Sequence, residues 1–273
     1  MSKGFCLIAQ NNDTTDYVKQ ACLLAVSIHK YSKNQSVSII TNDKIPKKYQ
    51  VLFDKIIPIE NDEAKDSDWK LENRYKLYDL TPYNQTIVMD VDMIMTGDIS
   101  HWWKYLKNYN LFFVSDVTTY RNEKIKNNYY RKTFQANNLP NIYCGIFYFK
   151  KNKFSKTFFN LLEVVTHNWE KFYSEYAPVY KQKWYSMDVS CSICCKILGI
   201  EKEITDKNNF ITFVHMKPHI QGWANVPLKW TNVLNWQINK SKQLYIGNYL
   251  QNNVFHYTED EFLDEKIIEA LET

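Results

Sequence analysis

Hydrophobic residues lie along this chain in short continuous runs rather than in simple alternation with polar ones. Strands covered on both faces have no polar face, so such runs predict strands of a mainly parallel sheet. A segment with apolar residues at helical spacing, which Thr14 or Thr15 can cap, follows the first run and ends near Lys30. This succession predicts an α/β fold with helices on both faces of a mixed sheet. The strands predicted in this way lie within 5–9, 37–41, 53–59, 111–116 and 142–149.

The rest of the chain continues this pattern without a linker, an internal repeat or a low-complexity tract, which predicts a single domain over 1–273. From Thr118 to Asn138 the chain is polar, basic and tyrosine-rich, and we expect a mobile loop or lid there. Apolar spacing predicts helices at 68–79, 154–169, 186–198 and 259–271, and strands at 210–214 and 253–257.

Charge and apolar content exclude several classes of partner. The 34 basic residues are scattered among 30 acidic ones, for a net charge of +4, so no basic stripe for a nucleic acid is present. No apolar run approaches the roughly 20 residues that span a bilayer. The first residues lead directly into a strand without a signal peptide, which predicts a cytoplasmic protein.

The six cysteines lack both secreted-framework and zinc-site spacing, and we expect reduced, mostly buried thiols.

The segment 86–95 carries the strongest chemical signal. Asp90 and Asp92 follow an apolar run, and in an extended chain they point to the same face, about 7 Å apart at Cα. Two acids in such a place are costly to bury unless a cation lies between them, so the pair predicts a divalent metal that carries a diphosphate. The alternative is an exposed strand end with two solvated acids. Ala9–Gln10 and Asn42–Asp43 also follow apolar runs, and ligands of parallel sheets bind at those strand ends.

Several short motifs follow one another along the chain, at 74–77, 82–83, 87–94, 143–146, 149–150, 187–188 and 255–257. In their order, the chain resembles nucleotide-sugar glycosyltransferases of the GT-A fold, and within them glycosyltransferase family 8, the glycogenin and bacterial galactosyltransferase relatives. The resemblance covers most of the chain and implies a Rossmann-like GT-A sheet. It departs from the family at Tyr143, where the family has Asn, and after His256, where the family's lysine is missing.

What the resemblance implies for the site can be stated residue by residue. The metal, Mn²⁺ or Mg²⁺, is expected on Asp90, Asp92 and His256, with His215 as the rival third ligand. Lys217 offers a substitute for the missing lysine. Asp188 and Asp116 are the expected catalytic carboxylates. The residues expected around the donor are Ala9, Gln10, Tyr17, Arg74, Lys76, Asp90, Val91, Cys144, Gly145 and Lys217.

The implied function is metal-dependent transfer of a sugar, with retention, from a nucleotide-diphosphate donor to a glycan or other hydroxyl acceptor. A uridine diphosphate sugar is the default donor. Residues 1–116 are expected to bind the nucleotide, and residues 117–273 to bind the acceptor and end in a helix. Two alternatives stay open: a sugar-nucleotide pyrophosphorylase, although the loop after the first strand has no glycine, and an inactive carbohydrate-binding protein on the same fold.

Overall fold

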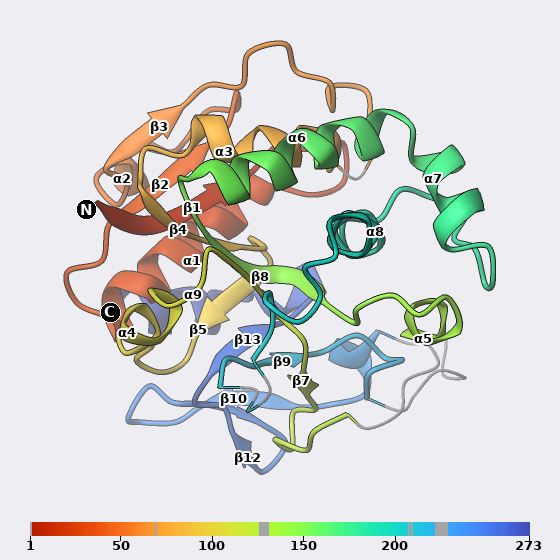
Figure 1. Ribbon diagram of the computed structural model, residues 1–273. Helices are drawn as coiled ribbons and strands as arrows, with labels where there is room; N and C mark the ends of the chain where they lie inside the picture. Colours follow the sequence, from red (N-terminus) through yellow and green to blue (C-terminus); the bar gives the residue numbers. More distant parts are fainter. Residues whose placement is uncertain (1, 69, 126–130, 207, 209, 222–228) are drawn as a thin grey trace.

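A computed structural model describes residues 2–68, 70–125, 131–206, 208, 210–221 and 229–273. Its largest sheet has six strands in the order β3-β2-β1-β4-β8-β6. The first four are mutually parallel, and β8 runs antiparallel to both of its neighbours. The predicted mixed, mainly parallel sheet is therefore confirmed (Figure 1). The strands are β1 (Lys3–Ile8), β2 (Val37–Ile40), β3 (Lys55–Ile57), β4 (Gln85–Met89), β6 (Leu111–Val114) and β8 (Tyr143–Lys150).

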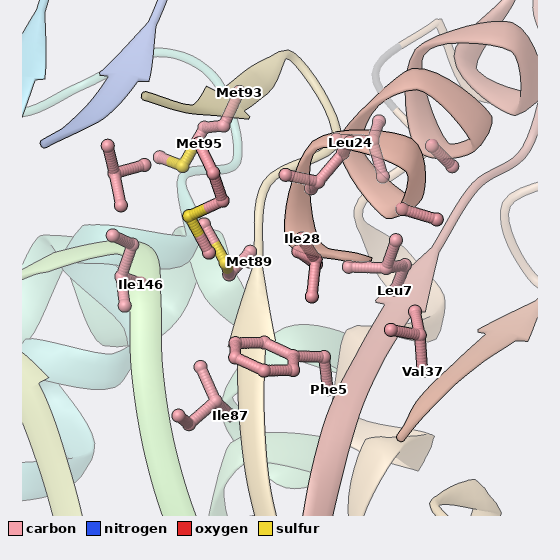
Figure 2. Close-up of a cluster of buried hydrophobic side chains, with 14 of the residues drawn as sticks. Phe5, Leu7, Leu24, Ile28, Val37, Ile87, Met89, Met93, Met95 and Ile146 are labelled. Atoms are coloured by element: carbon pink, nitrogen blue, oxygen red, sulfur yellow. The ribbon is translucent and has the colours of Figure 1, made fainter. Parts of the chain in front are cut away.

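Helices cover both faces of this sheet because its strands are apolar on both. In β1, Phe5 and Leu7 pack against α1 (Tyr17–Tyr31), whereas Cys6 and Ile8 face the cluster formed with α6 (Lys153–His167) and α8 (Met187–Leu198). Figure 2 shows Phe5 and Leu7 among side chains from β4, β5 and α1. The strand's side chains alternate between two buried layers, which explains its unbroken apolar run.

A second sheet, in the order β5-β13-β9-β7, lies beside the first on the side of α1 (Figure 1). Strand β13 (Val254–His256) pairs antiparallel with β5 (Met93–Met95) and parallel with β9 (Phe213–His215). Strand β7 (Val117–Thr118) forms its edge. A third, small sheet of two- and three-residue strands, which apolar periodicity is too short to predict, contains β10 (Trp236–Ile238), β11 (Leu244–Ile246) and β12 (Tyr249–Leu250).

The remaining helices are short. They are α2 (Lys47–Gln50), η1 (Glu72–Lys76), α3 (Leu77–Leu80), α4 (Trp102–Leu106), α5 (Lys132–Ala136), α7 (Trp169–Tyr176), η3 (Trp230–Asn232), η4 (Asp260–Phe262) and α9 (Glu265–Glu272). Within the described ranges, no helix is long and apolar enough to cross a membrane.

Several predicted boundaries were wrong for local reasons. The predicted helix over 68–79 begins only at Glu72, because Lys70 has a left-handed backbone with φ 53°. Asp16, rather than Thr14 or Thr15, caps α1 by accepting a hydrogen bond from the Lys19 N–H at 2.8 Å. The strand predicted at 210–214 begins at Phe213, because the Asp206 carboxylate first holds the Phe210 N–H in a turn. The terminal helix begins at Glu265 rather than at residue 259, because Asp264 caps it.

The predicted loop at 118–138 is only partly described. The Thr119 N–H donates to the Glu123 carbonyl, and α5 occupies the segment's last third. The centre of the predicted loop, 126–130, lies outside the described residues.

Candidate active site

Asp90 and Asp92 lie where the chain passes from the first sheet to the second. Strand β4 ends at Met89 and β5 begins at Met93, so the predicted single extended stretch is in fact two strands joined by a bend. The Asp90 N–H donates to the Gly145 carbonyl at 2.8 Å, and the Asp92 carbonyl accepts from the Tyr257 N–H at 3.1 Å. These bonds tie the bend to β8 and to the end of β13, and both carboxylates line one cavity.

The Asp92 carboxylate contacts His256, because Asp92 precedes β5 and His256 lies on β13, which pairs with β5. His256 Nε2 lies 2.8 Å from Asp92 Oδ2, and His256 is opposite Met93 in the β5–β13 register. Burial alone would raise the pKa of Asp92, but the charge and hydrogen bond of His256 lower it below its usual value. One ligand atom from each of Asp90, Asp92 and His256 lies within 4.8 Å of the others. The three residues predicted as metal ligands are therefore together.

Asp90 is held by a partly buried arginine. Arg74 Nη1 donates to Asp90 Oδ1 at 2.6 Å, and burial opposes the Arg74 charge while Asp90 raises its pKa. The other Asp90 oxygen faces Gly145: a Cβ at that position would lie 3.3 Å from Asp90 Oδ2 and 2.8 Å from Met93 Cε. A glycine is thus required beside the carboxylate, because a Cβ at this position would crowd Asp90 and Met93.

This donor set fits a divalent cation. Two carboxylates and a neutral imidazole suit Mn²⁺ better than Mg²⁺, which prefers oxygen ligands. Among the described residues, the buried Nδ1 atoms of His215 and His256 have no hydrogen-bond partner. The pKa of His215 lies well below its usual value. Burial is the largest cause, and the charges of His256, Lys217 and Arg131 add to it. His215 therefore offers a nitrogen lone pair at the same edge of the second sheet as His256.

A cavity of about 730 Å³ opens at the carboxyl ends of the parallel strands. It is lined by predicted residues from both halves of the chain, namely Gln10, Tyr17, Arg74, Asp90, Val91, Asp92, Cys144, Gly145, Asp188, His215, Lys217 and His256. Ala9 is buried beside it, between Ile8 and Gln10 of the wall.

One end of the cavity is built by an amide–carboxylate network behind Gln10. The Gln10 amide donates to Asp62 at 2.7 Å and accepts from Asn73 at 2.9 Å, while Asn73 also donates to Asp62 at 2.7 Å. Burial works to raise the pKa of Asp62, but these hydrogen bonds lower it. Tyr17 is half-buried nearby, and its pKa is raised by burial and by the negative charges of Asp92 and Asp260.

At the other end, Asp188 stands in the first turn of α8. One of its oxygens accepts from the Cys144 N–H at 2.8 Å, and the other pairs with Arg131. Sequence reasoning missed Arg131, because a single arginine beside an aperiodic stretch carries no pattern. Asp260 and Trp184 were also missed, and both line the cavity. A tryptophan four residues before Asp188 was the one sequence feature that could have indicated a ligand contact at this end; in the structure Trp184 is exposed.

Two predicted site residues, Lys76 near the donor and the catalytic carboxylate Asp116, do not line this cavity. Lys76 bonds the Asn61 carbonyl at 2.5 Å and pairs with Glu63 at 3.4 Å. Residues two apart on η1 point in different directions, so Lys76 does not accompany Arg74 into the cavity. Asp116 lines a smaller cavity of about 150 Å³, which shares Tyr143 with the larger one.

Comparison with known proteins supports the fold. No protein-family model and no curated protein sequence matches this chain. Among solved structures, an active-site variant of LgtC gives a TM-score of 0.53 at 13% identity, with 98% of this chain and 94% of that one covered. Galactosyltransferase LgtC with donor and acceptor sugar analogues gives 0.50 at 15% identity, covering 94% and 87%.

A third similar structure is the glycosyltransferase GlyE of Streptococcus pneumoniae, with a TM-score of 0.50 at 12% identity over 99% of this chain. This chain spans 59% of the length of GlyE. The chain therefore has the GT-A fold of these glycosyltransferases, as the sequence predicted. At such identities the likeness establishes the fold, and membership of family 8 stays a prediction.

Proposed function

We propose that this protein is a metal-dependent glycosyltransferase that moves a sugar from a nucleoside-diphosphate donor to a hydroxyl acceptor. The observation that carries the proposal is the grouping of Asp90, Asp92 and His256 at the wall of a cavity large enough for a nucleotide sugar. The GT-A fold supports it, since the cavity lies at the carboxyl edge of the sheet, where ligands of such folds bind.

The metal chemistry follows from the donor set. A divalent cation held by these residues would supply positive charge that stabilises the departing nucleoside diphosphate. Asp90 and Asp92 offer carboxylate oxygens, and His256 offers an imidazole nitrogen. We propose Mn²⁺, with Mg²⁺ as the alternative.

The remaining cavity residues divide into a nucleotide end and a sugar end. Tyr17 stacks on the base, and the held amide of Gln10 lies beside it, with uridine as the default base. The cations of Arg74 and Lys217 flank the diphosphate. In this assignment residues 1–116 supply most of the nucleotide contacts, whereas the metal site also needs His256 from the second half.

At the sugar end, Asp188 faces the donor sugar with Cys144 and Gly145. Its carboxylate stabilises positive charge at the anomeric carbon or orients the sugar hydroxyls. Retention of configuration, with the acceptor hydroxyl attacking from the leaving-group side, follows from the family resemblance. The acceptor is a glycan or another hydroxyl compound, and Asp116 is the carboxylate proposed on its side of the site.

Thermal-shift measurements with a panel of nucleotide sugars, with and without Mn²⁺, test this proposal first. We expect one donor to raise the melting temperature only with metal, and that donor to release nucleoside diphosphate when an acceptor is present. Asp92→Asn abolishes both effects, whereas Asp79→Asn, an exposed acid on α3, preserves them. Release of pyrophosphate indicates a pyrophosphorylase instead, and sugar binding without donor turnover indicates an inactive binding protein.

A further inference from the structure

Arg131 is buried behind the candidate active site, with its side chain 5% exposed. Its guanidinium lies between two aromatic rings, 3.8 Å from the Phe134 centroid and 4.0 Å from that of Tyr143. Taking an arginine out of water is costly unless its donors and its charge are satisfied. Here the two ring faces fix the plane of the group, and cation–π attraction offsets part of the cost of burial.

The three nitrogens of this guanidinium each have a different acceptor. Nε donates to Asn141 Oδ1 at 2.7 Å, Nη2 donates to the Ile142 carbonyl, and Nη1 donates to Asp188 Oδ2. Two of these acceptors belong to the segment that leads into β8, so the arginine is fixed to the strand that also carries Cys144. The direction of the third hydrogen bond, from Nη1 to Asp188, is therefore fixed without a ligand.

Each oxygen of the Asp188 carboxylate accepts a hydrogen bond from a neighbouring residue. Cys144 N–H donates to Oδ1 at 2.8 Å and Arg131 donates to Oδ2, yet the Asp188 side chain is 24% exposed and lines the larger cavity. Among the described residues that line that cavity, Asp188 is present and Arg131 is not. Arg131 therefore reaches a cavity ligand only through neighbours that line the cavity, by its hydrogen bond to Asp188 and its ring contact with Tyr143.

We propose that Arg131 is a positioning residue, which uses the slot between Phe134 and Tyr143 to hold the Asp188 carboxylate toward the donor sugar. The proposal rests on the proposed function, because it assigns a sugar to the Asp188 end of the cavity. A lysine cannot replace Arg131, since an ammonium is a point charge without the planar, forked donor set. Arg131 acts on the sugar end and leaves the nucleotide end unchanged.

The test compares R131K and R131M with R121K, a matched control on an exposed arginine that pairs with Glu123. With Mn²⁺ present, we expect R131K to lower kcat more than tenfold and to leave the affinity for nucleoside diphosphate within twofold. R121K changes neither quantity. Equal loss of nucleotide affinity and kcat in R131K overturns the proposal, because it indicates a general structural role.

A double-mutant cycle separates positioning from packing. In a D188N background, R131K is expected to change kcat less than twofold, because the group through which it acts has already been altered. Independent, multiplicative losses from D188N and R131K contradict the proposal. If the Arg131 variants do not fold, Asn141→Ser removes one acceptor of the guanidinium at an exposed position, and we expect a smaller loss in kcat with the same dependence on Asp188.

Crystal structures provide a readout that needs no activity. In wild type and R121K the Asp188 carboxylate is expected to keep its bond to the Cys144 N–H, whereas in R131K it rotates away. An unmoved carboxylate in R131K overturns the proposal. If the wild-type protein transfers no sugar from any donor, the proposed function fails, while the position of Asp188 in these structures still decides whether Arg131 fixes it.

Discussion

The imidazole rings of His215 and His256 lie parallel, with centroids 4.4 Å apart and planes 5° apart. The two residues are direct partners in the parallel pair β9–β13, so their side chains leave the sheet on the same face. Only His256 contacts Asp92, at 2.8 Å, and only His256 joins the two aspartates in the cluster of ligand atoms. The geometry therefore favours His256 over His215 as the third metal ligand.

Replacing each histidine by asparagine tests whether His256 rather than His215 is the third metal ligand. We expect His256→Asn to weaken Mn²⁺ binding more than tenfold, because it removes the imidazole that lies beside both carboxylates. His215→Asn is expected to change the affinity less than threefold. Isothermal titration with Mn²⁺ alone measures both, and circular dichroism checks that each variant folds. A larger loss in His215→Asn reverses the assignment.

Gly145→Ala tests how closely β8 packs against the metal site. An added Cβ meets Met93 Cε at 2.8 Å and Asp90 Oδ2 at 3.3 Å, so both side chains must move. Overpacking of this kind costs about 1–3 kcal/mol. We expect that loss in the free energy of unfolding, together with weaker Mn²⁺ binding, because Asp90 is displaced.

The neighbouring Ile146→Val variant is the control for Gly145→Ala. It removes a methyl group from the same strand at a cost of about 0.5–1.5 kcal/mol and leaves Asp90 untouched. Urea unfolding and Mn²⁺ titration on both variants give the comparison. Unchanged metal affinity in Gly145→Ala shows that the glycine serves strand packing alone.

The fold was predictable because its strands are buried on both faces, as β1 shows with Phe5 and Leu7 toward α1 and Cys6 and Ile8 toward α6 and α8. The carboxylate pair was predictable for a related reason. An acid directly after such a strand lies at the edge of the sheet, and the edge is where the cavity opens. The position of Asp90 and Asp92 could therefore be predicted from the residues next to them in the sequence.

Features that depend on distant contacts were not predictable. The bend between Asp90 and Asp92 exists because β5 pairs with a strand about 160 residues further along the chain, which periodicity cannot indicate. Arg131 acquires its role from Phe134, Tyr143 and Asp188, which only the folded chain brings together. Lys76 lies away from the cavity because it contacts Glu63 and the Asn61 carbonyl, partners that its position in the sequence does not indicate.

Tyr17→Ala is expected to weaken nucleoside diphosphate binding about tenfold, since stacking of a base on an aromatic ring contributes roughly 1–3 kcal/mol. Tyr17→Phe keeps the ring and is the matched control, expected within threefold of wild type. Calorimetry with Mn²⁺ present measures both affinities. Equal affinity in Tyr17→Ala and wild type excludes stacking on this ring.

The network behind Gln10 predicts a specific response to acid. Its carboxyl, Asp62, has a lowered pKa in the folded protein, because hydrogen bonds from Gln10 and Asn73 outweigh the effect of burial. The unfolded chain, with an ordinary Asp pKa of about 3.9, binds the proton more readily. The stability that Asp62 contributes is therefore fully present above that value and is lost as pH falls through the folded pKa.

We expect Asp62→Asn to show a shallower fall in the free energy of unfolding between about pH 5 and pH 3 than wild type does, because the variant has no proton to bind there. Asp66→Asn, an exposed acid nearby, is expected to follow the wild-type curve. Urea unfolding at a series of pH values measures the slopes. Parallel curves for Asp62→Asn and wild type contradict the prediction.

Trp184 stands at the cavity with its side chain in water: it is 54% exposed, yet it lines the same wall as Tyr185 and Asp188. The Tyr185 hydroxyl lies 2.9 Å from the Thr166 hydroxyl, which fixes the backbone beside the indole. An indole that lines a cavity beside a carboxylate offers an apolar face on which a ligand can stack. Because Trp184 lines the same cavity as Asp188, which is assigned to the sugar end, the acceptor is the expected partner.

Trp184→Ala is therefore expected to raise the KM for the acceptor at least fivefold while the KM for the donor stays within twofold. Tyr180→Ala is the matched control, because Tyr180 is 57% exposed on the same segment but is not among the described residues that line the cavity. Steady-state kinetics with each substrate varied in turn separates the two constants. A rise in the donor KM alone assigns the indole to the donor instead, and no change in either constant leaves its exposure without a role in binding.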